Sequence, residues 1–306
     1  MTILYALRKW FVIIFAAIMF MLVTPNGAAP HTVTDEENCK MCITVLSDCH
    51  LETTNLPCFK AFGTILKDAG NNSFGNDVAI FLGDNTMNGQ LIETPFFYGP
   101  VAKTNIADHT IIVCGNHDVG NGEGDYDKLY KRFKANSECV TGIYNDKPYY
   151  SVEIKGITFV VLCPEDLCVN EFPISDAQYE FLDETLKACT AAGKPTFVLA
   201  HHPVYDVEED DGERLEEILS RYPNVFYVSG HTHWPACDNW TFWKNYGYSE
   251  INLPRTTDLW ETEDGGIDCD GDGVQLEIYD NEVIARVRDF YHGEWKDDLT
   301  YHFTIE

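Results

Sequence analysis

Short apolar runs rich in β-branched residues recur along this chain, and between them apolar side chains return every three or four positions. The short runs predict buried strands, which we place at 42–47, 78–82, 110–114, 196–200 and 225–229. The periodic segments predict amphipathic helices, which we place at 56–68, 126–134, 176–189 and 212–220. Two pairs of runs joined by tight turns predict hairpins, at 149–154 with 157–162 and at 274–279 with 282–290. Strands that alternate with helices predict a layered α/β domain.

One aromatic segment departs from this alternation. No Pro- or Ser-rich linker and no internal repeat interrupts residues 31–306, so we expect a single domain there. Within it, Trp234–Glu263 is aromatic and irregular. We expect a long ordered loop of the kind that often carries function.

Residues 1–30 have the composition of a secretory signal peptide. Arg8 and Lys9 precede an apolar run over 10–23, and small residues follow. A membrane-spanning helix needs about 20 apolar residues, so this run is short for one. We therefore expect cleavage near Ala28 and a secreted or extracytoplasmic protein. The alternative is an uncleaved anchor, which would hold the protein to a membrane at the cell surface.

Composition and charge narrow the function classes. The 306 residues carry a formal net charge of −28, and 45% of them are hydrophobic. Such a surface repels polyanions and shows no basic footprint, so we expect no nucleic-acid partner. Abundant Phe, Tyr and Trp indicate a packed fold instead of a disordered acidic chain. Among the eleven cysteines, Cys163 and Cys168 are close enough in sequence to bridge a loop, which export would permit.

Several predicted strands end in a cluster of polar residues that can bind metals. These clusters are Ser47-Asp48-Cys49-His50, Gly83-Asp84-Asn85, Gly115-Asn116-His117-Asp118, Ala200-His201-His202-Pro203 and Ser229-Gly230-His231-Thr232-His233. Because the carboxyl ends of parallel strands lie at one edge of a sheet, the clusters should meet in space. Asp48 and His50 should face one way, since side chains alternate along an extended segment. The same argument applies to His231 and His233.

The donor types in these clusters indicate a mixed nitrogen and oxygen metal site. Seven side chains are candidate ligands: Asp48, His50, Asp84, Asn116, His201, His231 and His233. Seven ligands are more than one ion needs, and a carboxylate such as Asp84 can bridge two ions. A pair of ions about 3.5–4 Å apart is the usual arrangement for in-line displacement at phosphorus.

Taken in order, the motifs D-x-H, G-D, G-N-H-D, H-x-P and G-H-x-H resemble those of the calcineurin-like metallophosphoesterases. The resemblance runs from about Cys42 to the C-terminus. It implies a two-sheet β-sandwich flanked by helices, with αββα layers. The residues alone do not distinguish this fold from a doubly wound sheet.

The resemblance also implies roles for individual residues. One ion would take Asp48, His50, Asp84 and His233, and the other would take Asp84, Asn116, His201 and His231. A hydroxide between the ions would attack phosphorus. His117 would protonate the leaving oxygen as a general acid, and Asp118, its neighbour in sequence, would orient it. The ions are expected to be two of Fe, Mn or Zn, which ligand type does not separate.

Departures from the family motifs indicate which branch of the family this sequence resembles most. Met87 stands where the purple acid phosphatase branch has a tyrosine, and GDNTMNG and GNHD differ from the protein phosphatase motifs. The pattern is closest to the cyclic-nucleotide and glycerophosphodiester phosphodiesterase branch. We expect hydrolysis of a small phosphodiester or phosphomonoester. The alternatives are a purple-acid-phosphatase-like phosphomonoesterase and, in another class, a catalytically silent metal-binding scaffold.

Three weaker candidates remain. His202 is expected behind the ligands or facing the substrate, and Arg255 in the aromatic segment is a candidate for binding substrate phosphate. Asp268–Asp272 resembles the opening of a calcium loop, but Tyr279 stands at the twelfth position and no helix follows. We therefore favour an acidic turn before a strand over a calcium site.

Overall fold

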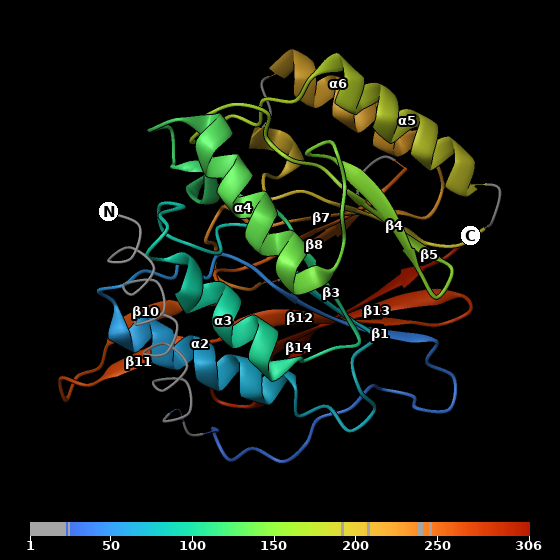
Figure 1. Ribbon diagram of the computed structural model, residues 1–306. Coiled ribbons are helices and arrows are strands. Elements are labelled where there is room, and N and C mark those ends of the chain that lie inside the picture. The colour runs from blue at the N-terminus through green and yellow to red at the C-terminus, as the bar shows by residue number, and fades with distance from the viewer. Residues whose placement is uncertain (1–22, 24, 191–192, 207–208, 238–240, 245–246) are drawn as a thin grey trace.

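Two six-stranded mixed sheets face each other, and helices cover the outer face of each sheet (Figure 1). The structure, a computed structural model, describes residues 23, 25–190, 193–206, 209–237, 241–244 and 247–306. The four layers confirm the predicted α/β sandwich with a helix–sheet–sheet–helix order. Figure 1 shows α5 and α6 on one side of the sheets and α2 and α3 on the other.

The first sheet combines the start and the end of the chain. Its strands, in spatial order, are β14 (Glu294–Thr304), β13 (Glu282–Asp289), β12 (Asp272–Ile278), β1 (Met41–Leu46), β2 (Val78–Phe81) and β3 (His109–Ile112). β1, β2 and β3 run parallel, whereas β12 to β14 form an antiparallel meander. The carboxyl ends of β1, β2 and β3 therefore lie at one edge.

The second sheet is built from the middle of the chain. Its strands, in spatial order, are β4 (Tyr150–Ile154), β5 (Ile157–Val161), β6 (Thr196–Leu199), β7 (Val225–Ser229), β9 (Ser249–Asn252) and β8 (Phe242–Lys244). β5, β6, β7 and β9 run parallel. The predicted hairpin of β4 and β5 pairs antiparallel at one end.

Alternate side chains of both sheets form a shared apolar core. On the first sheet, Ile43 and Val45 of β1 point into it. On the second, Phe159, Phe197 and Phe226 stack from strand to strand, with ring centroids 5.6 and 5.1 Å apart. Each stacked aromatic pair contributes about 0.5–1.5 kcal/mol beyond its buried area. The core thus holds the two sheets, and with them their strand ends, in a fixed relation.

Helices seal the outer faces of the sheets. α2 (Leu56–Ala69), α3 (Thr94–Thr104) and α4 (Tyr126–Thr141) pack on the first sheet, and α5 (Asp176–Thr190) and α6 (Glu209–Ser220) on the second. Asn55 caps the start of α2, and its side chain accepts a hydrogen bond from the backbone N–H of Cys58. α3 was not predicted, because Pro100 lies inside it and its apolar residues do not form one clear stripe.

The expected loop over Trp234–Glu263 is wrong in part. It contains β8 and β9, which complete the second sheet, and β10 (Asp258–Glu261), which pairs with β11 (Ile267–Asp270). These strands have only three or four residues, too few to show a period. Asp268–Asp272 lies on β11 and the start of β12, where Lys296 Nζ donates to Asp272 Oδ2 at 2.6 Å. The acidic stretch is thus part of strand pairing.

Two further expectations concern the N-terminus and the cysteines. Apart from Val23 and 25–30, the expected signal peptide lies outside the described residues. Among the described helices, none combines the length and the apolar character needed to cross a membrane. All eleven cysteines are described and all are free thiols, so no disulfide joins Cys163 to Cys168.

A buried ion pair fastens α2 to β13 and provides a test of the fold. Arg288 donates from Nε and Nη2 to the two carboxylate oxygens of Asp68, at 2.7 and 3.1 Å. Asp68→Asn leaves the buried guanidinium uncompensated, so the free energy of unfolding should fall by about 3–5 kcal/mol. Urea denaturation measures the change. Asp280→Asn, which breaks the exposed pair with Lys40, should cost less than about 1 kcal/mol. Equal losses in both variants would contradict this role.

Candidate metal centre

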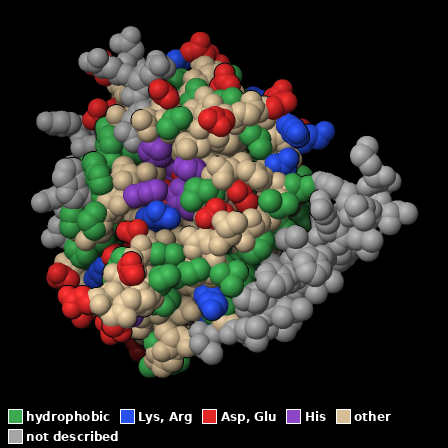
Figure 2. Space-filling model, turned by 90° about the vertical axis from the view of Figure 1, so that its left-hand side faces the viewer, with side chains coloured by type: hydrophobic (Ala, Val, Ile, Leu, Met, Phe, Trp, Pro, Cys, Tyr) green, Lys and Arg blue, Asp and Glu red, His purple; other side chains and the backbone are tan. Residues whose placement is uncertain are grey.

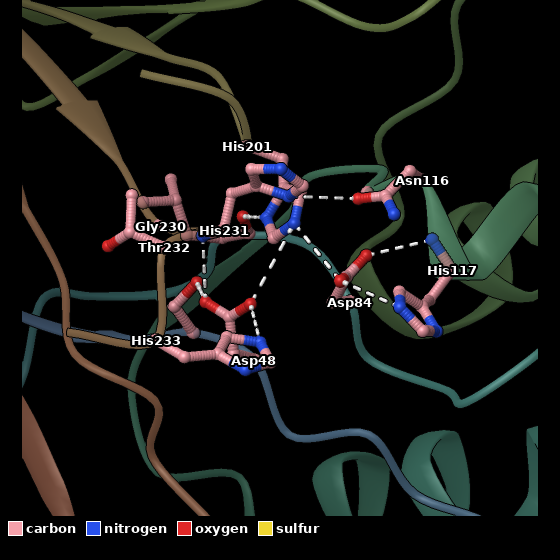
Figure 3. Close-up of polar contacts among 12 residues, drawn as sticks. Asp48, Asp84, Asn116, His117, His201, Gly230, His231, Thr232 and His233 are labelled. Atoms are coloured by element: carbon pink, nitrogen blue, oxygen red, sulfur yellow. Dashed lines mark hydrogen bonds and ion pairs between the residues drawn. The ribbon is translucent and has the colours of Figure 1, made fainter. Parts of the chain in front are cut away.

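Five loops meet at the edge where the parallel strands of both sheets end (Figure 3). Asp48 and His50 follow β1, Asp84 follows β2, and Asn116 with His117 follows β3. The second sheet contributes His201 after β6, and His231 and His233 after β7. The polar clusters predicted from the sequence therefore converge, although they are far apart along the chain.

The backbone of these loops differs from the extended form expected for D-x-H and H-x-H. Five candidate ligands have positive φ angles of 44–72°: Asp48, His50, Asp84, His231 and His233. Non-glycine residues rarely adopt this left-handed conformation. The side chains converge because the chain turns sharply just beyond the strand, and not because neighbours alternate along it. Backbone strain of this kind costs about 1–3 kcal/mol per residue and clusters at functional sites.

Two glycines allow the loops to approach one another closely. A Cβ on Gly115 would lie 2.2 Å from Asp84 Oδ1, and a Cβ on Gly230 would lie 2.1 Å from Ser47 Oγ. Both distances are far below van der Waals contact. The glycines of G-N-H-D and G-H-x-H are therefore needed for the spacing of the carboxylates.

One group of four side chains surrounds a possible ion position. The ligand atoms of Asp48, His50, Asp84 and His233 all lie within 4.8 Å of one another. His50 Nε2 is 2.9 Å from His233 Nε2, and His233 Nε2 is 3.1 Å from Asp48 Oδ1. His50 Nε2 is also 3.7 Å from Asp84 Oδ2. The ligand atoms of these four side chains therefore surround a common centre, where one ion could bind.

A second group shares Asp84 with the first. It consists of Asp84, His201 and His231, again with ligand atoms within 4.8 Å. His201 Nε2 lies 3.2 Å from Asp84 Oδ2, and Asn116 Oδ1 lies 3.1 Å from His231 Nδ1. The structure therefore arranges all seven predicted ligands as two groups with one common carboxylate.

The electrostatics of the cluster favour a cation. Asp48 and Asp84 are completely buried. Burial alone would lower the pKa of His201, but the charges of Asp84 and Asp48 raise this pKa to about 9. By contrast, burial and the neighbouring His201 lower the pKa of His231 to about 4. The negative potential of the two carboxylates thus attracts positive charge, while His231 stays neutral, as a metal ligand must.

A buried nitrogen supports the fit of a metal ion. His201 Nδ1 lies 2.9 Å from the carbonyl oxygen of Leu82 and donates to it, because a carbonyl only accepts. In the neutral form that binds a metal, Nε2 would carry the lone pair and face the carboxylate of Asp84, whose Oδ2 is 3.2 Å away. Apart from the carboxylates, this buried nitrogen has no hydrogen-bond partner among the described residues. A backbone carbonyl behind a metal-ligating histidine is the usual means of fixing its orientation.

His117 lies at the mouth of the cluster. Its backbone N–H donates to Asp84 Oδ1 at 2.9 Å, and its Nδ1 donates to the carbonyl of Met87 at 2.6 Å. Nε2 is therefore the free ring nitrogen, 3.9 Å from Asp84 Oδ2. This side chain is about one-fifth exposed, so a substrate can reach it.

Asp118 does not orient His117 directly, as its place in the sequence suggested. Its carboxylate is buried and accepts hydrogen bonds from the backbone N–H groups of Thr86 and Gly115 and from the side chain of Asn85. Burial and the charge of Asp84 raise the pKa of Asp118 to about 6. Asp118 thus ties the loop after β2 to the loop after β3. It positions His117 only through this loop, which also presents the Met87 carbonyl.

His202 cannot touch a substrate in this structure. Its ring is completely buried and stacks between Phe172 and His231, with centroids 5.1 and 4.4 Å away. Of the two expected positions, behind the ligands or facing the substrate, the structure shows the first, and the alternative of a substrate-facing residue is corrected: His202 lies behind the ring of His231.

Arg255 is held beside the loop after β1. The backbone N–H of Thr256 donates to the carbonyl of Ser47 at 3.0 Å, and Thr257 Oγ1 donates to the carbonyl of Cys49 at 2.7 Å. The guanidinium is half-buried, and its Nε has no hydrogen-bond partner among the described residues. Figure 2 shows histidines at the centre of this face with a basic side chain next to them.

Sequence reasoning missed two residues that orient the cluster. Ser47 Oγ donates to Asp48 Oδ2 at 2.6 Å. Asn252 on β9 donates to the carbonyl of Gly230 at 2.8 Å and accepts from Thr232 Oγ1 at 2.7 Å. Ser47 is adjacent to a ligand and could have been suspected. Asn252 lies in a short strand far along the chain, and no pattern marks it.

Comparisons with known proteins agree with this fold. The sequence matches the calcineurin-like phosphoesterase family over residues 41–235, more than half of the chain. This chain therefore belongs to the calcineurin-like phosphoesterases, which makes it a metal-dependent phosphoric ester hydrolase. No curated protein matches it.

Solved structures of low sequence identity share its fold. A dimetal phosphatase from Danio rerio is 12% identical over 88% of this chain and 100% of its own, with a TM-score of 0.63. PhoD is 12% identical over 92% of this chain and 70% of its own, with a TM-score of 0.51. GAP50, the anchor in the inner membrane complex of Plasmodium, is 15% identical over 88% and 90%, with a TM-score of 0.50.

Replacing the shared carboxylate tests the two-group arrangement. Asp84→Asn removes the charge that both groups use, so bound metal should fall by about half or more. Elemental analysis of the dialysed protein measures this. Asp298→Asn, an exposed position on β14, should keep the full metal content. Unchanged metal in Asp84→Asn would contradict the shared position.

Proposed function

We propose that this chain is an exported phosphoesterase that hydrolyses a small phosphodiester or phosphomonoester with two metal ions. One observation carries the proposal: two groups of nitrogen and oxygen donors share the carboxylate of Asp84. Two adjacent ions are suited to displacement at phosphorus, since both the attacking and the leaving oxygen need stabilisation. Export is inferred from the sequence of residues 1–30.

The chain's residues divide between holding the ions and handling the substrate. Asp48, His50 and His233 would hold one ion, Asn116, His201 and His231 the other, and Asp84 would bridge them. When bound, the ions neutralise charge on the phosphoryl oxygens and lower the pKa of water. The absence of cysteine among these ligands suits Fe, Mn or Zn.

His117 is the proposed proton donor to the leaving group. Because Nδ1 donates to the carbonyl of Met87, the ring is fixed with Nε2 toward the carboxylate of Asp84 and the solvent side. A protonated Nε2 there can give its proton to the leaving oxygen. The carbonyl of Met87 thus takes part in positioning His117, and the Met87 side chain stands where a purple acid phosphatase has its tyrosine. This favours the phosphodiesterase-like branch over the purple acid phosphatases.

Arg255 and the overall charge restrict the substrate. An unpartnered Nε beside the loop of Asp48 can bind a phosphate oxygen. With two divalent ions in place, the site attracts anions locally, while the formal charge of −28 repels polyanions at long range. A small phosphate ester therefore fits better than a nucleic acid.

Removal of His117 tests the proton donor. His117→Ala should lower kcat by about 100-fold for an alkyl ester but by less than about tenfold for a p-nitrophenyl ester, whose leaving group needs no proton. Steady-state kinetics on both substrates measure the difference. His302→Ala on the exposed face of β14 serves as the control and should change neither rate. Equal losses on both esters would refute the role.

Removal of Arg255 tests phosphate binding. Arg255→Met should raise KM by about tenfold, because a charge-assisted hydrogen bond to the phosphate is lost. Lys131→Met on the exposed side of α4 is the matched control, and its KM should stay unchanged. An unaltered KM in Arg255→Met would exclude Arg255 from the binding site.

A further inference from the structure

Three aromatic side chains gather beside the loops that follow β6 and β7. Tyr205 stacks on Trp234 with ring centroids 5.7 Å apart and planes 13° from parallel. The ring of Trp243 is tilted by 32° against that of Tyr205, with centroids 6.4 Å apart. We call Tyr205, Trp234 and Trp243 the aromatic shelf. Tyr205 is 48% exposed, which is unusual for a ring so well ordered by its neighbours.

The shelf is connected directly to the loops that carry metal ligands. Trp234 follows His233 in the chain, and Tyr205 is four residues beyond His201, in a short 3-10 helix. The shelf is therefore joined to the ligand loops at two points of the chain, after His201 and after His233. Hydrophobic side chains border the histidines on the face seen in Figure 2.

A buried carboxylate fixes the shelf in place. Trp243 Nε1 donates to Glu250 Oε2 at 3.0 Å, and the backbone N–H of Val204 also hydrogen-bonds to Glu250. Glu250 lies on β9 and is 1% exposed. One side chain of the second sheet thus holds both the indole of Trp243 and the residue before Tyr205. A rigid, partly exposed aromatic surface is preorganised for stacking, because little conformational entropy is lost on binding.

We infer that the aromatic shelf binds a flat aromatic ring in the leaving group of the substrate, such as the base of a nucleoside phosphate. The inference rests on the proposed function, since the ester phosphate must lie at the metal centre. Stacking on an aromatic side chain suits any base or aryl ring. An alkyl or simple sugar phosphate has no such ring and gains only the phosphate contacts.

A matched pair of substrates tests the shelf. AMP and ribose 5-phosphate have the same phosphate ester bond, and only AMP carries a base. Their phosphate methyl esters form the corresponding pair of phosphodiesters. The metal-loaded wild-type protein should show about tenfold higher kcat/KM for the member with the base. Tyr205→Ala should bring the ratio of the two close to one, and Tyr205→Phe should restore it, because Phe keeps the ring. Tyr144→Ala, an exposed tyrosine before β4, should keep the wild-type ratio.

Binding provides a second readout that does not need turnover. AMP should quench the fluorescence of the shelf tryptophans more than ribose 5-phosphate does, and Tyr205→Ala should weaken this binding. If no phosphate ester is hydrolysed at all, the proposed function fails. The fluorescence measurement still shows whether the shelf binds the base of AMP. Equal values for the two substrates in the wild type, a preference for the sugar phosphate, or an unchanged ratio in Tyr205→Ala would each overturn the inference.

Discussion

Two buried carboxylates, Asp48 and Asp84, impose the main constraint on this fold. A carboxylate removed from water costs several kcal/mol unless partners compensate its charge. The chain supplies these partners from both sheets: the backbone N–H of His231 and the hydroxyl of Ser47 for Asp48, and the backbone N–H of His117 for Asp84. Loops of distant sequence must therefore converge on the same edge, and the sandwich provides a rigid base for that convergence.

The same constraint explains where the backbone is strained. Left-handed residues occur at the ligands themselves, and glycines occur where one loop must touch the carboxylate of another. A relaxed, extended strand end would direct successive side chains to opposite faces and separate Asp48 from its partners. The packed apolar core between the sheets offsets this conformational cost. Backbone strain is thus located in the loops at the edge of the sheets, whereas the stabilising apolar contacts lie between the sheets.

Much of the fold and most of the cluster followed from the sequence, because short apolar runs that end in polar clusters give a strong signal. β1, β2, β6 and β7 each end where the sequence predicted, directly before a cluster of candidate ligands. Short strands such as β8, and α3 with its internal proline, gave no period to detect. Adjacency in sequence was a poor guide to direction at Asp118, whose carboxylate bonds to the loop after β2 instead of to His117. For His202 the sequence left two positions open, and the structure places it behind His231. Such directions depend on loop geometry, which a residue pattern does not contain.

The order of strands makes assembly of the site depend on the end of the chain. β1 pairs with β12, so Met41 lies opposite Ile278, more than two hundred residues later. β7 likewise pairs with β9, which lies beyond the residues 41–235 that match the family. During synthesis, β1 and β7 would remain open edges that are prone to wrong pairing. Because Asp48 and His231 directly follow these strands, a chain without β12 and β9 would leave the strands beside the candidate metal centre unpaired on one side.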